Sequence, residues 1–293
     1  PKNFLDYELQ KEVHSDLLWW FEGLTSWLGD VICLRSGAWS EEDYRKDWTR
    51  KMKRHLQRNG MEHESLQESS HDAWIHLYCP NSYSREVHIS YYLEGELAVF
   101  CLDVEIRKRS KGEFGLDDVL VRLYNKHHID AEDPGINHAD IKRELVNIPG
   151  ARRLGSFLDE LVSGRKSPLV EDAIKKLGMT MVPEKEEKGA WLGLNLSVNS
   201  GAVKVTTHHS NSPCRDFIQT GDEIIAVNNL RIRNVKELNA AIFDKIDNEI
   251  EITICRQAVL QRVAVKPISN PNYKVKLDGK GNKIWRSIAD TKQ

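Results

Sequence analysis

The stretch Leu17–Asp30, LLWWFEGLTSWLGD, organises the rest of the chain. Apolar residues recur in it at the spacing of an α-helix, which predicts an amphipathic helix packed into a hydrophobic core. These residues are Leu17, Trp20, Phe21, Leu24, Trp27 and Leu28. One carboxylate, Glu22, lies among the aromatic side chains, where a charge is costly to desolvate unless a cation or a metal ion accompanies it. From the periodicity alone, the solvated side of the helix is the favoured place for Glu22.

Composition sets broad limits on fold and partners. The 293 residues suffice for two domains, and 40% hydrophobic with 29% charged residues is typical of a globular, soluble chain. The net charge of -2 does not indicate nucleic acid or an anionic membrane as a partner, and no apolar run approaches membrane-spanning length. Five scattered cysteines without a CxxC pair argue against a disulfide framework and against a cysteine-based zinc site.

The first part of the chain is predicted to be mainly helical. Ser15 or Asp16 is expected to cap the first helix, after an irregular lead-in over residues 1–14. Ser40 begins a capping-box pattern for a second helix that is expected to run to about Arg58. Residues 61–88 are polar and broken. Further helices are expected over residues 89–108, 116–126, from Asn137 onward, 154–163 and 168–177.

The pattern changes after a charged, helix-breaking linker at residues 183–189. Short runs of β type follow at 191–198, 202–207, 223–227, 249–255 and 262–265, with one helix at 235–243. We therefore predict an α+β chain with a mainly helical part at 1–182 and a small β-rich domain at 187–267. Residues 268–293 form a C-terminal tail, either weakly structured or running as a strap back onto the body.

A complete zinc peptidase motif is missing from the sequence. His-Glu-x-x-His places two imidazoles one helical turn apart beside a general base. His63-Glu64 is followed by Ser-Leu-Gln, and the remaining histidines do not complete the pattern. On spacing alone, we expect no complete metal site within these residues.

Four segments nevertheless resemble, in order, the glycyl aminopeptidase family of zinc metallopeptidases. Residues 18–26, LWWFEGLTS, resemble the family segment LW-x-x-EG-x-T, and residues 1–7, PKNFLDY, resemble the segment before it. Residues 69–74, SSHDAW, resemble SS-x-DAW, and residues 90–95, SYYLEG, resemble SYY-x-KG. The resemblance implies a mainly helical catalytic subdomain followed by a PDZ domain. Each segment alone is a weak signal, but four in the right order are specific.

The resemblance implies roles for particular residues. Glu22 would be the third protein ligand of a catalytic Zn²⁺ ion, completing a site with one open position. Tyr92 would stabilise the oxyanion during peptide hydrolysis. Tyr91 is the competing candidate, because two neighbours on a helix point about 100° apart and only one can face the metal. Glu94 departs from the family pattern, which usually has Lys at this position.

The second domain resembles PDZ domains of bacterial proteases. Residues 221–228, GDEIIAVN, carry the specific part of the resemblance, and residues 212–214, SPC, match a second segment, whereas Asn229 replaces the usual Gly. Leu192, Gly193 and Leu194 correspond to the carboxylate-binding loop, whose N–H groups receive a peptide C-terminus. The alternative is a PDZ fold that packs only on its own catalytic domain.

We therefore expect the C-terminal portion of a zinc aminopeptidase that removes Gly or Ala from peptides, inactive without the missing His-Glu-x-x-His segment. The PDZ domain would bind peptide or regulate access. The alternative is a non-catalytic, PDZ-based peptide-binding protein. The chain reads as a piece of a longer protein. Its compartment is left open between the cytoplasm and the periplasm of a bacterium, with the unpaired cysteines favouring the cytoplasm.

Overall fold

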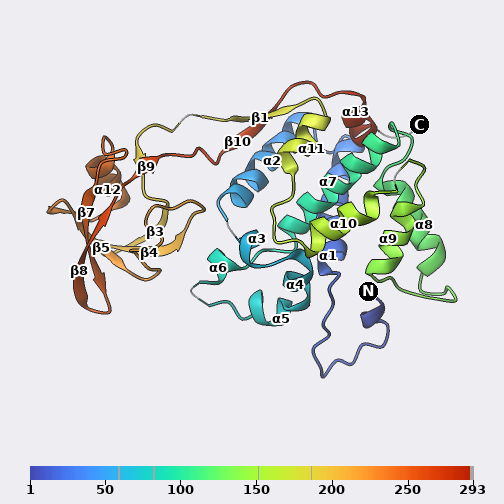
Figure 1. Cartoon of the computed structure of the whole chain (residues 1–293), viewed down its shortest axis with the longest axis horizontal. Coiled ribbons are helices and arrows are strands. Elements are labelled where there is room, and N and C mark those ends of the chain that lie inside the picture. The colour runs from blue at the N-terminus through green and yellow to red at the C-terminus, as the bar shows by residue number, and fades with distance from the viewer. Residues whose placement is uncertain (59, 82, 151, 186, 291–293) are drawn as a thin grey trace.

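The computed structural model describes residues 1–58, 60–81, 83–150, 152–185 and 187–290. Figure 1 shows a helical region beside a smaller β-rich region, with extended segments running between them. The helical region begins with the 3₁₀ helix Lys2–Phe4. Its helices are α1 (Leu18–Arg35), α2 (Glu41–Leu56), α3 (Gly60–His63), α4 (Leu66–His71), α5 (Ala73–His76), α6 (Ser84–Val87), α7 (Leu93–Arg109), α8 (Leu116–His127), α9 (His138–Val146), α10 (Leu154–Ser163) and α11 (Val170–Lys176).

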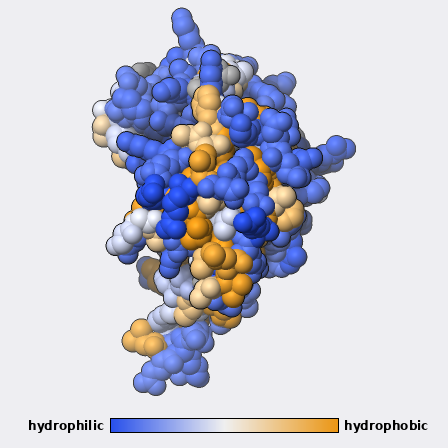
Figure 2. All heavy atoms as spheres, turned by 90° about the vertical axis from the view of Figure 1, so that its left-hand side faces the viewer, coloured by the Kyte–Doolittle hydropathy of each residue, from blue (hydrophilic) through white to orange (hydrophobic). Residues whose placement is uncertain are grey.

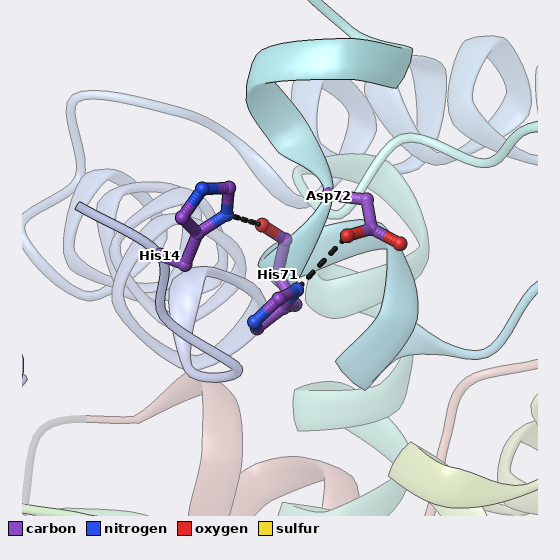
Figure 3. A group of neighbouring side chains, drawn as sticks. All are labelled: His14, His71 and Asp72. Atoms are coloured by element: carbon purple, nitrogen blue, oxygen red, sulfur yellow. Dashed lines mark hydrogen bonds and ion pairs between the residues drawn. The ribbon is translucent and has the colours of Figure 1, made fainter. Parts of the chain in front are cut away.

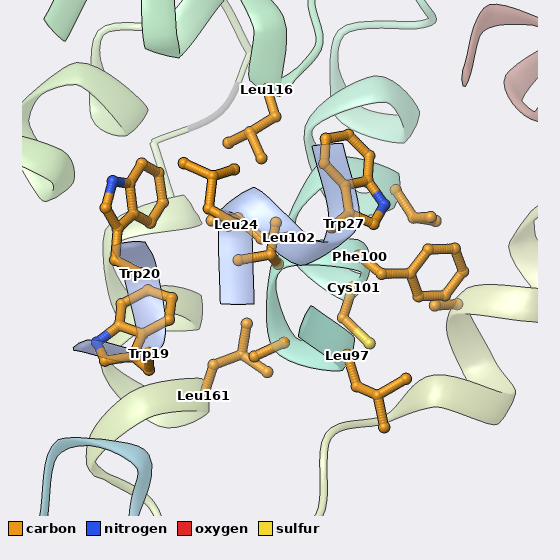
Figure 4. Packing of buried hydrophobic residues seen from close by; sticks show 14 of the residues in the cluster. Trp19, Trp20, Leu24, Trp27, Leu97, Phe100, Cys101, Leu102, Leu116 and Leu161 are labelled. Carbon is orange, nitrogen blue, oxygen red and sulfur yellow. The ribbon is translucent and has the colours of Figure 1, made fainter. Parts of the chain in front are cut away.

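The core of the helical region lies between α1 and α7. Figure 4 shows the indoles of α1 and the apolar side chains of α7 gathered around this contact. The predicted core positions Leu17, Trp20 and Trp27 are each 2% exposed or less. The helix expected from the sequence is therefore confirmed, but Trp19, which lies outside the predicted apolar face, is also buried.

Two glycines set the distance between α1 and α7. A Cβ atom on Gly23 would lie 2.4 Å from the carbonyl carbon of Gly95, and one on Gly95 would lie 2.7 Å from the carbonyl oxygen of Trp19. The backbones touch because neither residue has a side chain. Gly23 directly follows Glu22, so this contact fixes the turn of helix that carries the carboxylate.

Helices begin where the sequence predicts when the capping residue is adjacent to the helix in sequence. Ser40 and Asp43 form the expected capping box of α2, and Asn137 caps α9. The prediction that Ser15 or Asp16 caps the first helix was wrong. The helix starts after Leu17 without a side-chain cap, and the N–H of Trp19 donates instead to Ser70 Oγ at 2.9 Å.

The third long helix starts later than predicted, at Leu93 rather than Ile89. The N–H of Ile89 donates to Glu64 Oε2 at 2.8 Å, and its carbonyl oxygen accepts a hydrogen bond from Ser69 Oγ. These bonds to other segments compete with a helical turn. The preceding stretch, expected to be broken, contains the short helices α3 to α6.

The β-rich region contains an antiparallel sheet in the order β3-β4-β5-β7-β8, with β6 paired to β5. Its core is a separate cluster that includes Val203, Ile224, Leu238 and Ile252. The strands and helix are β2 (Ala190–Trp191), β3 (Leu194–Asn199), β4 (Ala202–His208), β5 (Glu223–Val227), β6 (Leu230–Arg231), α12 (Val235–Ile242), β7 (Ile250–Arg256) and β8 (Val259–Val265).

The C-terminal segment returns from the β-rich region to the helical region (Figure 1). Strand β9 (Ile268–Ser269) pairs with β2, and β10 (Val275–Asp278) pairs with β1 (Thr180–Pro183). Helix α13 (Lys283–Ala289) then buries Trp285, 1% exposed, in the helical core. Of the two forms left open for residues 268–293, the described part has the form of a strap. None of the helices in the described part of the chain has the length and hydrophobicity needed to span a bilayer.

Candidate metal centre

Glu22 lies in the second turn of α1 and is half-buried. Its backbone carbonyl accepts hydrogen bonds from Thr25 and Ser26. Within the described ranges, no Lys, Arg or His nitrogen lies within ion-pair distance of its carboxylate. A partly desolvated carboxylate without a cationic neighbour is the kind of group that binds a metal ion.

The phenol of Tyr92 is the polar neighbour of this carboxylate. Burial is the largest cause that raises the pKa of Tyr92. The negative charge of Glu22 and a hydrogen bond to the Glu22 carboxylate raise that pKa further. The Tyr92 side chain stays accessible, with 38% of its surface exposed. The structure therefore brings together two residues that are seventy positions apart in sequence.

Tyr91 and Tyr92 do not diverge as predicted. They precede α7 rather than lying in it, and their rings stack with centroids 4.8 Å apart at an interplanar angle of 27°. The rings stack although Tyr92 itself has helical dihedral angles, φ -68° and ψ -61°. Tyr91 is only 2% exposed, and burial with a hydrogen bond to Tyr78 raises its pKa. Tyr92 is thus the phenol that a ligand can reach.

Glu94, the position that departs from the family pattern, is directed to α2. Its Oε2 lies 2.7 Å from His55 Nδ1, and both side chains are buried. Burial opposes the charged imidazole, but the charge and hydrogen bond of Glu94 outweigh that effect and raise the pKa of His55. The carboxylate is therefore neutralised within the helical core.

A buried charge cluster, missed by the sequence analysis, lies farther along α1. Lys51 bonds to Asp30, to Asp47 at 2.6 Å and to Glu96 at 2.5 Å. Burial raises the pKa of Glu96 to about 7, against the opposing charge of Lys51. Only the Asp47–Lys51 pair has a sequence signal, its i,i+4 spacing on one helix. The other two carboxylates come from α1 and α7.

A second group of possible metal ligands comes from α5 and from the residues that directly follow α3 and α6. Glu64 Oε1 lies 2.6 Å from His76 Nδ1 and 3.2 Å from His88 Nδ1, and the two imidazole rings stack 3.7 Å apart. Spacing could not reveal this group, because tertiary folding assembles it. Its internal hydrogen bonds already satisfy the three ligand atoms.

A third group, His14, His71 and Asp72, lies beside the start of α1 (Figure 3). His14 Nδ1 lies 2.8 Å from the carbonyl oxygen of His71, and His71 Nδ1 lies 2.9 Å from Asp72 Oδ1. In Figure 3 one carboxylate oxygen of Asp72 is turned toward His71. This arrangement favours hydrogen bonding over a shared ion.

The loop Leu192-Gly193-Leu194 lines a groove of about 440 Å³ that lies beside β3 and α12. Gly193 adopts φ +70°, and the N–H of His209 donates to its carbonyl oxygen at 2.8 Å. Among the described residues, the backbone N–H groups of Leu192 and Gly193 find no acceptor. Unpaired N–H groups at the end of a groove are suited to a carboxylate.

The β-rich region also makes direct contact with the helical region. The N–H of Ser210 donates to the carbonyl oxygen of Gln57 at 2.9 Å, and His208 bonds to Glu86. The groove beside β3 and α12 does not include Ser210 or His208. The β-rich domain therefore packs on the helical region and keeps its groove open. Figure 2 is viewed from the end of the molecule that carries the β-rich region, and it shows apolar residues gathered in a band between hydrophilic ones.

Comparisons with known proteins agree with this architecture. Residues 1–98 match the family model described as M61 glycyl aminopeptidase, and residues 190–266 match the PDZ domain model. The solved structure of an aminopeptidase N family protein from Idiomarina loihiensis aligns with a TM-score of 0.83 at 21% identity, covering 99% of this chain and 51% of that one. This chain thus spans about half the length of that structure.

Other comparisons add little. A search of curated proteins gave no match. The HtrA-type protease AlgW with a decapeptide aligns at 13% identity over 28% of this chain and 30% of that one, with a TM-score of 0.27 that carries no argument. Residues 1–98 are thus similar to the M61 glycyl aminopeptidase family, and the same chain continues into residues 190–266, which match a PDZ domain.

Proposed function

We propose that this chain is the C-terminal part of a zinc-dependent aminopeptidase that removes Gly or Ala from peptides. The observation that carries the proposal is the pairing of the Glu22 carboxylate, which lacks a cationic partner among the described residues, with the accessible phenol of Tyr92. The family match over residues 1–98 supports the same assignment.

The residues present fit one part of a zinc site. A catalytic zinc ion takes three protein ligands and keeps one position open, and a carboxylate is one of the accepted ligand types. Glu22 would be that carboxylate, and two histidines from outside these 293 residues would complete the set. When bound, zinc would polarise the scissile carbonyl and lower the pKa of a water molecule.

The chain's own residues would position the metal ligand and stabilise the oxyanion. The close contact of Gly23 with Gly95 holds the Glu22 turn of α1 against a buried helix. Tyr92 would donate its O–H to the negative charge that develops on the carbonyl oxygen. A tyrosine phenol is protonated at neutral pH, and the environment of Tyr92 raises its pKa further, so it acts as a neutral donor.

Tyr92→Phe tests this role in the natural protein that contains this chain with its upstream residues. Loss of one oxyanion donor should lower kcat for Gly- or Ala-anilide by about 10²–10³-fold, with little change in KM. Tyr91→Phe is the matched control, because that phenol is buried, and kcat should stay within about fivefold. Wild-type kcat in both variants would rule out the proposed donor, and a loss confined to Tyr91→Phe would transfer the role to Tyr91.

A second candidate function is peptide binding at the PDZ groove. The unpaired N–H groups of Leu192 and Gly193 favour it, because they match the C-terminal carboxylate of an added strand. Fluorescence anisotropy with decapeptides should show binding of the free acid and at least tenfold weaker binding of its C-terminal amide. Equal affinity for both forms would contradict carboxylate recognition. The two functions are compatible in one protein.

A further inference from the structure

A separate pocket of about 310 Å³ lies where the helical region meets the PDZ domain. Arg54 of α2, Arg58 just after α2 and Arg85 of α6 line it from the helical side. Strand β4 contributes polar side chains from the other side, namely Thr206, Thr207 and His208. The pocket shares none of its lining residues with the Glu22 site, and it shares only Leu196 of β3 with the PDZ groove.

The three arginines carry unbalanced positive charge. In the ranges that the structure describes, none of them forms an ion pair with a carboxylate. Burial, followed by the charges of Arg54 and Arg85, lowers the pKa of Arg58. Glu94 opposes this effect, but its carboxylate is already hydrogen-bonded to His55 at 2.7 Å. The like charges of these guanidinium groups repel one another in the empty pocket, and this repulsion opposes their burial.

The PDZ side of the pocket holds an unsatisfied polar atom. His208 is 6% exposed, and its Nδ1 lies 2.8 Å from Glu86 Oε1. Glu86 Oε1 also accepts hydrogen bonds from the N–H of His208 at 3.0 Å and from Thr220 Oγ1 at 3.1 Å. The other ring nitrogen, Nε2, is buried and has no partner among the described residues. Because Nδ1 donates to a carboxylate, Nε2 of a neutral imidazole is an acceptor, so the donors on this side of the pocket are the hydroxyls of Thr206 and Thr207.

We propose that this interdomain pocket binds a small oxyanion, a phosphate or carboxylate group, held between Arg54, Arg58 and Arg85 on one side and β4 on the other. Guanidinium groups match the planar and bidentate geometry of both anions, and threonine hydroxyls supply further donors. At about 30 Å³ per water molecule, the pocket has room for roughly ten non-hydrogen atoms. The bound anion would tie the PDZ domain to the helical region beside the Ser210–Gln57 contact.

Calorimetric titration of the full chain at constant ionic strength tests the proposal, with inorganic phosphate in one arm and succinate in the other. We expect saturable one-site binding of at least one anion. Binding of phosphate alone would identify a phosphate ligand, and binding of both would identify a general oxyanion site. Arg58→Gln should weaken this binding at least tenfold, whereas Arg152→Gln, at an exposed position of the helical region, should change it less than twofold.

Thermal unfolding gives an independent readout that also controls for folding. Arg58→Gln removes a repelled charge, so the anion-free variant should unfold at or above the wild-type temperature. Phosphate should then raise the unfolding temperature of the wild type and not that of Arg58→Gln. Absence of saturable binding, or equal weakening by Arg58→Gln and Arg152→Gln, would overturn the proposal.

Discussion

Gly23→Ala is expected to destabilise the helical region by about 3 kcal/mol, at the upper end of the cost of overpacking. The new Cβ atom would lie 2.4 Å from the carbonyl carbon of Gly95 and 2.7 Å from the backbone nitrogen of Glu96. Backbone atoms of a buried helix cannot move aside as a flexible side chain can. Helices α1 and α7 would have to separate, and Glu22 would move with α1.

Gly29→Ala is the matched control for this substitution. Gly29 lies on the same helix, and a Cβ atom there meets nothing within 4 Å. The alanine should stabilise the helix by up to about 1 kcal/mol, because glycine is the poorer helix former. Urea unfolding monitored by tryptophan fluorescence measures both effects. Equal midpoints for Gly23→Ala and the wild type would show that the two helices are not held at the distance described.

Glu22→Gln is expected to have the largest effect on activity. The amide keeps the size of the side chain but loses the negative charge that a zinc ligand supplies. Loss of an outer hydrogen-bond partner of a metal ligand costs 10–100-fold in metal affinity or activity. Loss of a ligand itself should exceed this, so we expect kcat/KM on Ala-anilide to fall by more than about 100-fold, with loss of bound zinc.

Ser26→Ala controls for disturbance of the helix. Ser26 lies one turn after Glu22, and its Oγ donates to the Glu22 carbonyl oxygen at 2.8 Å. The variant removes a contact of the same turn without touching the carboxylate, so activity should stay within about threefold. Zinc content by elemental analysis and anilide hydrolysis should be measured on the same preparations. Retention of zinc and activity in Glu22→Gln would exclude the proposed ligand.

The sequence predicts the elements whose determinants are local. The capping patterns at Ser40 and Asn137 and the apolar period of the first helix involve residues within a few positions of one another, and the structure confirms them. Prediction failed where a distant side chain supplies the hydrogen bond. Ser70 satisfies the start of α1, and Glu64 holds Ile89 out of α7.

The candidate site also has features that the sequence predicts and features that it does not. Glu22 stands out in the sequence because a charge lies within an apolar helix, and a resemblance of motifs was needed to connect it with Tyr92. The stacking of Tyr91 on Tyr92 could not be predicted, because residue spacing carries no signal for the orientation of the two rings. The arginine pocket could not be predicted from the sequence either. Its side chains come from α2 and α6 on one side and from β3 and β4 on the other, and no spacing in the sequence relates them.

The account depends most on the position of the metal. Anomalous diffraction at the zinc edge, from crystals of the natural protein with its upstream residues, locates that ion directly. We predict a peak about 2.0–2.2 Å from a Glu22 carboxylate oxygen, on the side that faces the Tyr92 phenol. A zinc peak at Glu64, His76 and His88 with none beside Glu22 would contradict the account.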